Sequence, residues 1–67
     1  MKAVSGKEMC RILERQGWAL KRIRSSHHRY EKPGHSPVVV PVHGNKTLKT
    51  GTQHDIMKNA GLADADL

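Results

Sequence analysis

Two short patterns, one near each end of the chain, have the form of a capping box that begins a helix: Ser5-Gly6-Lys7-Glu8 and Thr50-Gly51-Thr52-Gln53. Apolar residues at helical spacing extend the first pattern to about residue 16 and the second to about residue 60. A glycine follows each segment, and glycine is the residue that most readily ends a helix. Helices near both ends leave the middle of the chain to form a sheet.

The middle of the chain predicts three strands, over residues 18–24, 27–32 and 38–42. The last of these is the clearest, because valine dominates it and β-branched residues favour strands. A turn or bulge is expected at Ser25-Ser26, and the residues from Pro33 to Pro37 are typical of a hairpin loop. The predicted fold class is α+β, in the order α-β-β-β-α, with a three-stranded antiparallel sheet covered on one face by two helices.

The chain has 67 residues and a single cysteine, Cys10. This length predicts a single domain over residues 1–67. The change in composition at Asp64 and Asp66 indicates a short acidic tail over 63–67 that follows a core over about 5–62. One cysteine excludes an internal disulfide, and we expect Cys10 to be a small buried residue. No apolar run is long enough for a membrane span, and no signal peptide is visible, so we expect a cytoplasmic protein without membrane contact.

Basic residues outnumber acidic ones, with 12 Lys and Arg against 6 Asp and Glu and a formal charge of +6. This balance favours a polyanionic partner, with nucleic acid the first candidate. The alternative is a solvated basic surface that binds nothing in particular. Five of the basic residues fall close together in the sequence: Lys21, Arg22, Arg24, Arg29 and Lys32.

This basic cluster surrounds the segment Arg24-Ser25-Ser26-His27-His28-Arg29-Tyr30. Histidine exchanges protons near neutral pH, and arginine is the side chain best shaped to bind phosphate. The segment therefore favours RNA chemistry. Neighbouring residues on a strand face opposite sides, so His27 and His28 are not expected to share one site. We expect His28 to pack in the core or at a sheet edge.

Four blocks of sequence carry a family resemblance, in order and at matching spacing. They are Gln16-Gly17-Trp18, Ser26-His27-His28-Arg29-Tyr30, Val40-Pro41-Val42-His43, and the stretch from Leu48-Lys49-Thr50-Gly51-Thr52 to Ile56-Met57-Lys58-Asn59-Ala60-Gly61-Leu62. Together they resemble the HicA toxins of bacterial toxin–antitoxin systems, also described as the YcfA-like family. The resemblance covers nearly the whole chain, from about Ser5 to Leu62.

The resemblance implies a double-stranded-RNA-binding-domain-like fold, cleavage of mRNA and inhibition by a HicB-type antitoxin. It also implies that His27 is the catalytic residue. We expect a metal-independent endoribonuclease with no small-molecule cofactor, in which His27 takes the proton from a ribose 2′-OH as general base. The alternative for His27 is a surface histidine without a role. The family usually has glycine where this chain has Ser25, which indicates an unusual backbone conformation or a close approach of phosphate there.

The expected RNA-binding residues surround His27 in the sequence, with one further along the chain. They are Lys21, Arg24, Ser25, Ser26, Arg29, Tyr30 and His43. The cations would hold phosphates and offset the charge of the transition state. Tyr30 could stack on a base, although a buried sheet aromatic is an equal alternative. His43 is expected to contact RNA or the antitoxin.

Other kinds of function stay open at this point. The 5 histidines raise the question of zinc, but their spacing matches no common zinc site, so no metal is predicted. The same fold could serve as a non-catalytic RNA-binding module, because a fold does not determine an activity. A third possibility is a protein that acts only through its protein partner.

Overall fold

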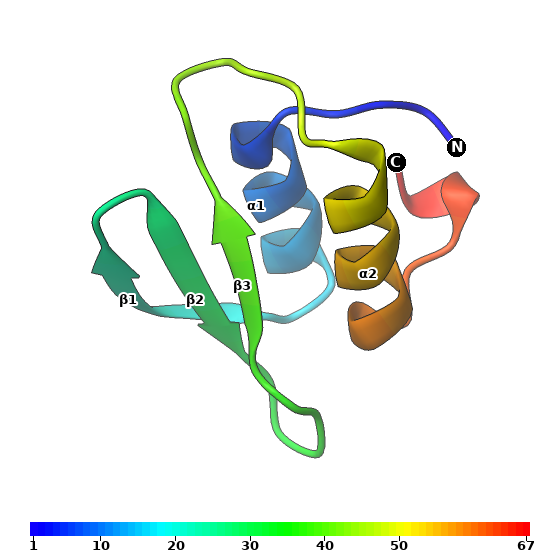
Figure 1. The fold of residues 1–67 in the computed structure, drawn as a ribbon. Helices are drawn as coiled ribbons and strands as arrows, with labels where there is room; N and C mark the ends of the chain where they lie inside the picture. The colour runs from blue at the N-terminus through cyan, green and yellow to red at the C-terminus, as the bar shows by residue number, and fades with distance from the viewer.

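The structure, a computed structural model, describes all residues from Met1 to Leu67. The elements in chain order are α1 (Gly6–Arg15), β1 (Ala19–Arg24), β2 (His27–Glu31), β3 (Val38–Pro41), α2 (Thr50–Ala60) and a short 3-10 helix, η1 (Asp64–Asp66). The three strands form one antiparallel sheet in the order β1-β2-β3, and both helices lie against the same face of it (Figure 1). The predicted α+β class and double-stranded-RNA-binding-domain-like arrangement are confirmed. No helix has the length and apolar character that a membrane crossing needs.

The first helix begins as the sequence predicts. The Ser5 hydroxyl accepts a hydrogen bond from the Glu8 backbone N–H at 3.1 Å, and the Glu8 carboxylate accepts one from the Ser5 N–H at 2.9 Å. These bonds favour the ionised carboxylate and hold the pKa of Glu8 below its ordinary value. Gly6 follows, and a side-chain carbon there would collide with the carbonyl oxygen of Pro41. Glycine thus lets the start of α1 lie directly against the end of β3.

The second predicted capping box is wrong. The N-cap of α2 is Lys49 and no side chain caps the helix. Gln53 instead lies in the interior, 1% exposed, where its Nε2 donates to the Lys2 carbonyl at 2.6 Å and its Oε1 accepts from the Val4 N–H at 3.1 Å. An amide side chain that satisfies two backbone groups away from water is worth more there than at an exposed helix end. The predicted end of α2 is confirmed, because Gly61 has a left-handed φ of 69°.

The sheet contains a β-bulge that the sequence analysis did not place. Leu20 pairs with Tyr30 and Ile23 pairs with His28, with the register shifted between Leu20 and Arg22. Lys21 is therefore the extra residue of the bulge. Because Tyr30 and His28 lie on one face of β2, Leu20 and Ile23 also share that face although they are three residues apart.

The turn between β1 and β2 consists of Ser25 and Ser26, between the paired residues Arg24 and His27. Ser25 has φ 55° and is the one residue other than glycine with a positive φ. A two-residue hairpin loop with positive φ at its first position alone is typical of a type II′ turn, which prefers glycine there. The backbone conformation that the family's glycine indicated is thus present, with serine in it.

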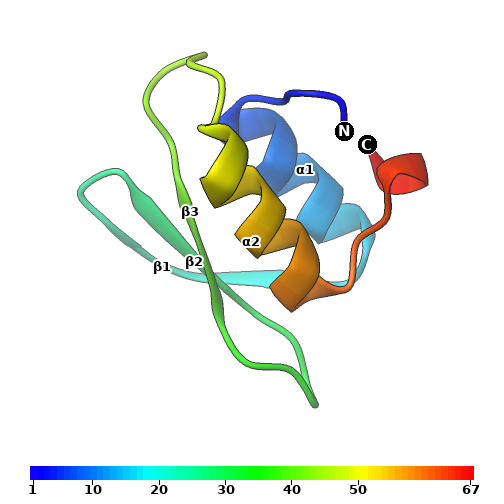
Figure 2. The same ribbon diagram turned by 45° about the vertical axis from the view of Figure 1, so that its right-hand side comes forward.

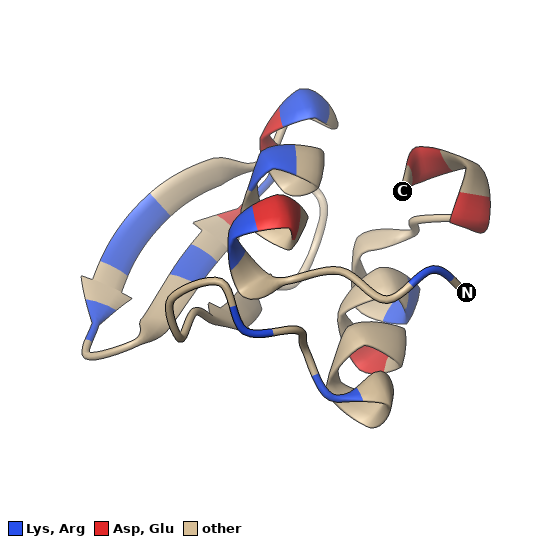
Figure 3. Ribbon diagram, turned by 90° about the horizontal axis from the view of Figure 1, so that it is seen from above, with Lys and Arg blue, Asp and Glu red and all other residues tan.

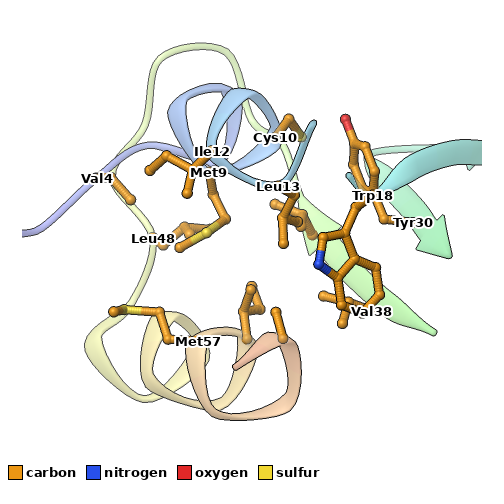
Figure 4. Packing of buried hydrophobic residues seen from close by; sticks show 13 residues of the cluster. Val4, Met9, Cys10, Ile12, Leu13, Trp18, Tyr30, Val38, Leu48 and Met57 are labelled. Carbon is orange, nitrogen blue, oxygen red and sulfur yellow. The ribbon is translucent and has the colours of Figure 1, made fainter. Parts of the chain in front are cut away.

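The core consists of 13 buried apolar residues that come from both helices, the sheet and the segments next to them (Figure 4). Trp18 lies at one end of it, with its ring centroid 5.3 Å from that of His35 in the β2–β3 loop. The last residues fold back on this core instead of forming a free tail (Figure 2). Leu67 packs against the core, and Gln16 Nε2 donates to Asp66 Oδ1 at 3.3 Å.

Candidate functional site

One face of the sheet has no helix over it, and we call it the open face. Pairing between the strands decides which side chains it carries, because paired residues share a face. Arg24 and Pro41 pair with His27, and Arg22 and Val39 pair with Arg29. Figure 3 shows Lys and Arg along β1 and β2, and also on α1 and the loop before α2, whereas the C-terminal turn carries acidic residues. The open face comprises Lys21, Arg22, Arg24, His27, Arg29, Glu31, Val39 and Pro41.

His27 is the first residue of β2 and follows directly after the Ser25-Ser26 turn. Its side chain is exposed. No hydrogen bond or ion pair to another side chain holds the imidazole. The turn below it is fixed, because the Ser26 carbonyl accepts a hydrogen bond from the Val42 N–H at 2.8 Å. An accessible imidazole on an anchored strand end can take a proton from a bound molecule.

Cations lie next to His27 on two sides. Arg24 is its cross-strand partner, and Arg29 is the next residue of β2 on the same face. Arg22 pairs with Arg29 and joins this group, although it was not among the predicted site residues. Alternate residues of a strand share a face, so Arg22 lies on the same face as Arg24 and therefore as His27. Strand alternation alone could have identified Arg22 as a site residue.

The open face also carries one carboxylate. Arg29 Nε donates to Glu31 Oε2 at 3.0 Å. The Arg29 side chain is 38% exposed and the Glu31 side chain is 41% exposed. Lys21 and Arg22 border the same hollow as this pair. An exposed ion pair of this kind contributes little to stability, and the remaining N–H groups of the guanidinium stay free for a phosphate.

Tyr30 does not lie on the open face, so its prediction as an RNA-binding residue needs correction. The side chain is 1% exposed and points toward α1, where its hydroxyl donates to Glu14 Oε2 at 2.6 Å. Burial, together with Cys10 and Glu14 beside it, raises the pKa of Tyr30 well above the usual range. A ring enclosed in this way cannot stack on a base, and the alternative of a buried sheet aromatic is the one the structure shows.

His28 lies on the same face of β2 as Tyr30 and is half-buried at the side of α1. The expectation that His27 and His28 point to opposite faces is thus met. Cys10 is 8% exposed and belongs to the core, as predicted, and burial raises the pKa of its thiol. No three His, Cys, Asp or Glu side chains come together in an arrangement that could hold a metal ion.

His43 is exposed and lies beyond the end of β3, outside the open face. It borders a second hollow, together with Lys46, Lys49 and Thr52 near the start of α2. Pro41 borders this hollow as well, and Pro41 is paired with His27. The basic surface therefore continues from the open face around the end of β3 to the loop before α2.

Comparison with known proteins agrees with this arrangement. A search of curated proteins finds no match. A sequence model described as the HicA toxin of bacterial toxin–antitoxin systems matches residues 6–62, which include every strand and both long helices. The match takes in the Ser25-Ser26 turn and the exposed His27. On the strength of a match over most of its length, the chain belongs to the HicA family of bacterial toxins.

Proposed function

We propose that this toxin is an endoribonuclease that cleaves mRNA in the cytoplasm, with His27 as general base and without a metal. The observation that carries the proposal is the position of His27 on the open face. It is exposed at a strand end, unpartnered, and next to Arg24 and Arg29 in the sheet. A polyanion held by this face would bring a phosphodiester against the imidazole.

The chemistry that fits these groups is attack by the neighbouring ribose hydroxyl. Neutral His27 takes the proton of the 2′-OH, and the 2′-oxygen forms a bond to the adjacent phosphorus. The bond from phosphorus to the 5′-oxygen breaks, and this leaving oxygen takes a proton from water. The products are a 2′,3′-cyclic phosphate and a free 5′-OH. Arginine N–H groups offset the charge that builds up on the phosphate oxygens.

A cleavage assay with a matched pair of variants tests the role of His27. His27→Ala should lower the rate of RNA cleavage by about a hundredfold or more, which is the usual contribution of a general base. His28→Ala is the control, because this neighbouring histidine lies on the covered side of the sheet. An RNA with a single 2′-deoxy sugar at the cleavage point should stay intact, and EDTA should have no effect. Equal activity of wild type and His27→Ala would refute the assignment.

RNA binding is measured separately from cleavage, because the two can fail independently. Affinity for RNA should fall linearly with salt concentration on a log–log plot, and Arg22→Ala or Arg24→Ala should each reduce the slope by about one. Lys58→Ala is the control cation, since Lys58 lies in α2 on the covered side of the sheet. If the slope is the same in all three variants, the open face does not bind RNA.

A non-catalytic RNA-binding module is the second candidate, and one observation favours it. Ser25 has a positive φ at a turn position where glycine is preferred, so the turn that holds His27 is strained. A module of this kind would bind RNA with the salt dependence above and give no product. For either function we propose a HicB-type antitoxin as the inhibitor, because toxins of this class act as one half of a pair.

A further inference from the structure

The side of β1 that faces α1 carries two large apolar side chains that remain exposed. Leu20 is 43% exposed and Ile23 is 54% exposed. The bulge at Lys21 brings the two onto one face, on the side of His28 and Tyr30. Leu20 and His28 border a hollow between the sheet and α1, whose other walls include Lys7 and Arg11. Most of the apolar side chains on the covered side of the sheet lie in the core, so these two are the exception.

The backbone of β1 is also without a partner on its outer side. The strand order β1-β2-β3 makes β1 an edge, and every residue of β1 is exposed. In Figure 1, β1 lies at the outer margin of the sheet. An edge strand presents N–H and C=O groups that a further extended segment can pair with.

Charge decides which kind of segment fits. On the covered side, the hollow beside Leu20 has Lys7 and Arg11 above it, while its one carboxylate, Glu14, accepts the Tyr30 hydroxyl. On the open side, Arg22 and Arg24 follow the same edge. A second copy of this chain paired through β1 would bring these cations face to face, and like charges opposite each other are destabilising. An acidic segment meets opposite charge on both sides.

We propose that the antitoxin adds an extended segment to the β1 edge, with apolar side chains over Leu20 and Ile23 alternating with carboxylates beside Arg22 and Arg24. The alternation follows from strand geometry, because successive side chains of the added strand point to opposite faces of the sheet. This segment neutralises part of the RNA-binding face, because Arg22 and Arg24 belong to it. The inference rests on the proposed inhibition by an antitoxin and adds where and by what chemistry it docks.

The test uses a short synthetic peptide of alternating valine and glutamate as the probe, with a peptide of the same composition in two blocks as its control. The alternating peptide should bind the whole chain, shift the amide NMR signals of Lys21 to Arg24, and lower affinity for RNA. Ile23→Ala should weaken peptide binding about tenfold, the loss expected for removing part of one apolar contact. Val39→Ala is the matched control, because Val39 is similarly exposed at 45% but lies on the open face of β3.

Three results would overturn the proposal. They are no binding of the alternating peptide, equal binding of the block peptide, and binding that Ile23→Ala leaves unchanged. Circular dichroism and thermal unfolding show whether Ile23→Ala is folded, and Leu20→Ala provides a second variant on the same face. The cleavage assay stands apart from this one. If His27→Ala cleaves RNA normally, the proposed mechanism fails while the peptide experiment still decides whether β1 is a docking edge.

Discussion

The two faces of β2 differ in almost every physical respect although their residues alternate in the sequence. Tyr30 on the covered face is enclosed and hydrogen-bonded to Glu14, whereas His27 on the open face is exposed and unpartnered. The covered face holds the domain together, and the open face presents charge to solvent. Within this five-residue strand, the residues that stabilise the fold lie on one face of the sheet and the candidate catalytic and binding residues lie on the other. A substitution on the covered face of β2 should therefore affect mainly stability, whereas one at a neighbouring position on the open face should affect mainly activity.

The largest expected effect is on the covered face. Tyr30→Ala should lower the free energy of unfolding by about 4 kcal/mol, because it empties the space of a buried aromatic ring. This is a large part of the stability expected for a domain of this size. His27→Ala should change the free energy of unfolding by less than about 0.5 kcal/mol, as exposed substitutions do. Denaturation with urea measures both, and similar losses in the two variants would abolish the distinction between the faces.

The next effect concerns the contact that seats α1 on the sheet. Gly6→Ala should cost about 3 kcal/mol, because the new methyl group collides with the backbone of Pro41. Gly51→Ala is the matched control within α2, where an added carbon has no neighbour within 4 Å. That variant should be neutral or more stable, since alanine favours helix over glycine. Thermal unfolding of the two variants side by side distinguishes a close backbone contact from a general effect of losing glycine.

A smaller effect, in which a substitution stabilises the fold, is expected at the Ser25-Ser26 turn. Ser25→Gly should raise the free energy of unfolding by about 0.5–1 kcal/mol, because glycine adopts a positive φ without the cost that a side chain incurs. Ser26→Gly has no such strain to relieve and should be destabilising. The cleavage rate of Ser25→Gly should equal or exceed that of the wild type. A less stable Ser25→Gly would show that the turn is not strained.

The smallest effect is a pH dependence at the start of α1. The pKa of Glu8 is below its ordinary value of 4.5 in the folded chain, chiefly because of the hydrogen bond from the Ser5 backbone. The ionised form therefore stabilises the fold above that ordinary pKa, and the contribution is lost as the pH falls through the lower folded value. The melting temperatures of wild type and Glu8→Gln should differ at neutral pH and converge in acid. Ser5→Ala removes the hydroxyl but keeps the backbone N–H, so this variant should keep most of the pH dependence. A difference between wild type and Glu8→Gln that grows in acid would contradict this account.

Much of the fold could be predicted because local signals agree with the tertiary structure. The capping box at Ser5, the valine-rich third strand and the glycine after α2 each act over a few residues. The prediction of a second capping box was wrong because its glutamine forms hydrogen bonds with residues far away in the sequence. Gln53 bonds with Lys2 and Val4, and nothing near residue 53 in the sequence indicates them.

The sequence allowed most of the basic residues of the candidate site to be predicted, but only part of the arrangement of its side chains. Strand alternation places His27 and Arg29 together, and the turn adds Arg24 across from them. Tyr30 was misplaced because an aromatic residue in a basic segment fits either stacking or burial, and only the position of α1 decides. The bulge at Lys21 was also missed, although two apolar residues three apart in a strand are the signal it leaves.

The hydrogen bonds of Gln53 have a consequence for how the chain folds as it is synthesised. They join residues 49 and 51 positions apart, and the Leu48 N–H also donates to the Val4 carbonyl, so the segment before α1 gains these bonds only after the three strands have been synthesised. Contacts between distant parts of a sequence form late, because the loop between them must close first. The helix that completes the core thus leaves the ribosome after all three strands of the sheet. In a partly synthesised chain, the basic strands β1 and β2 are therefore exposed before α2 is present to complete the core that supports the sheet.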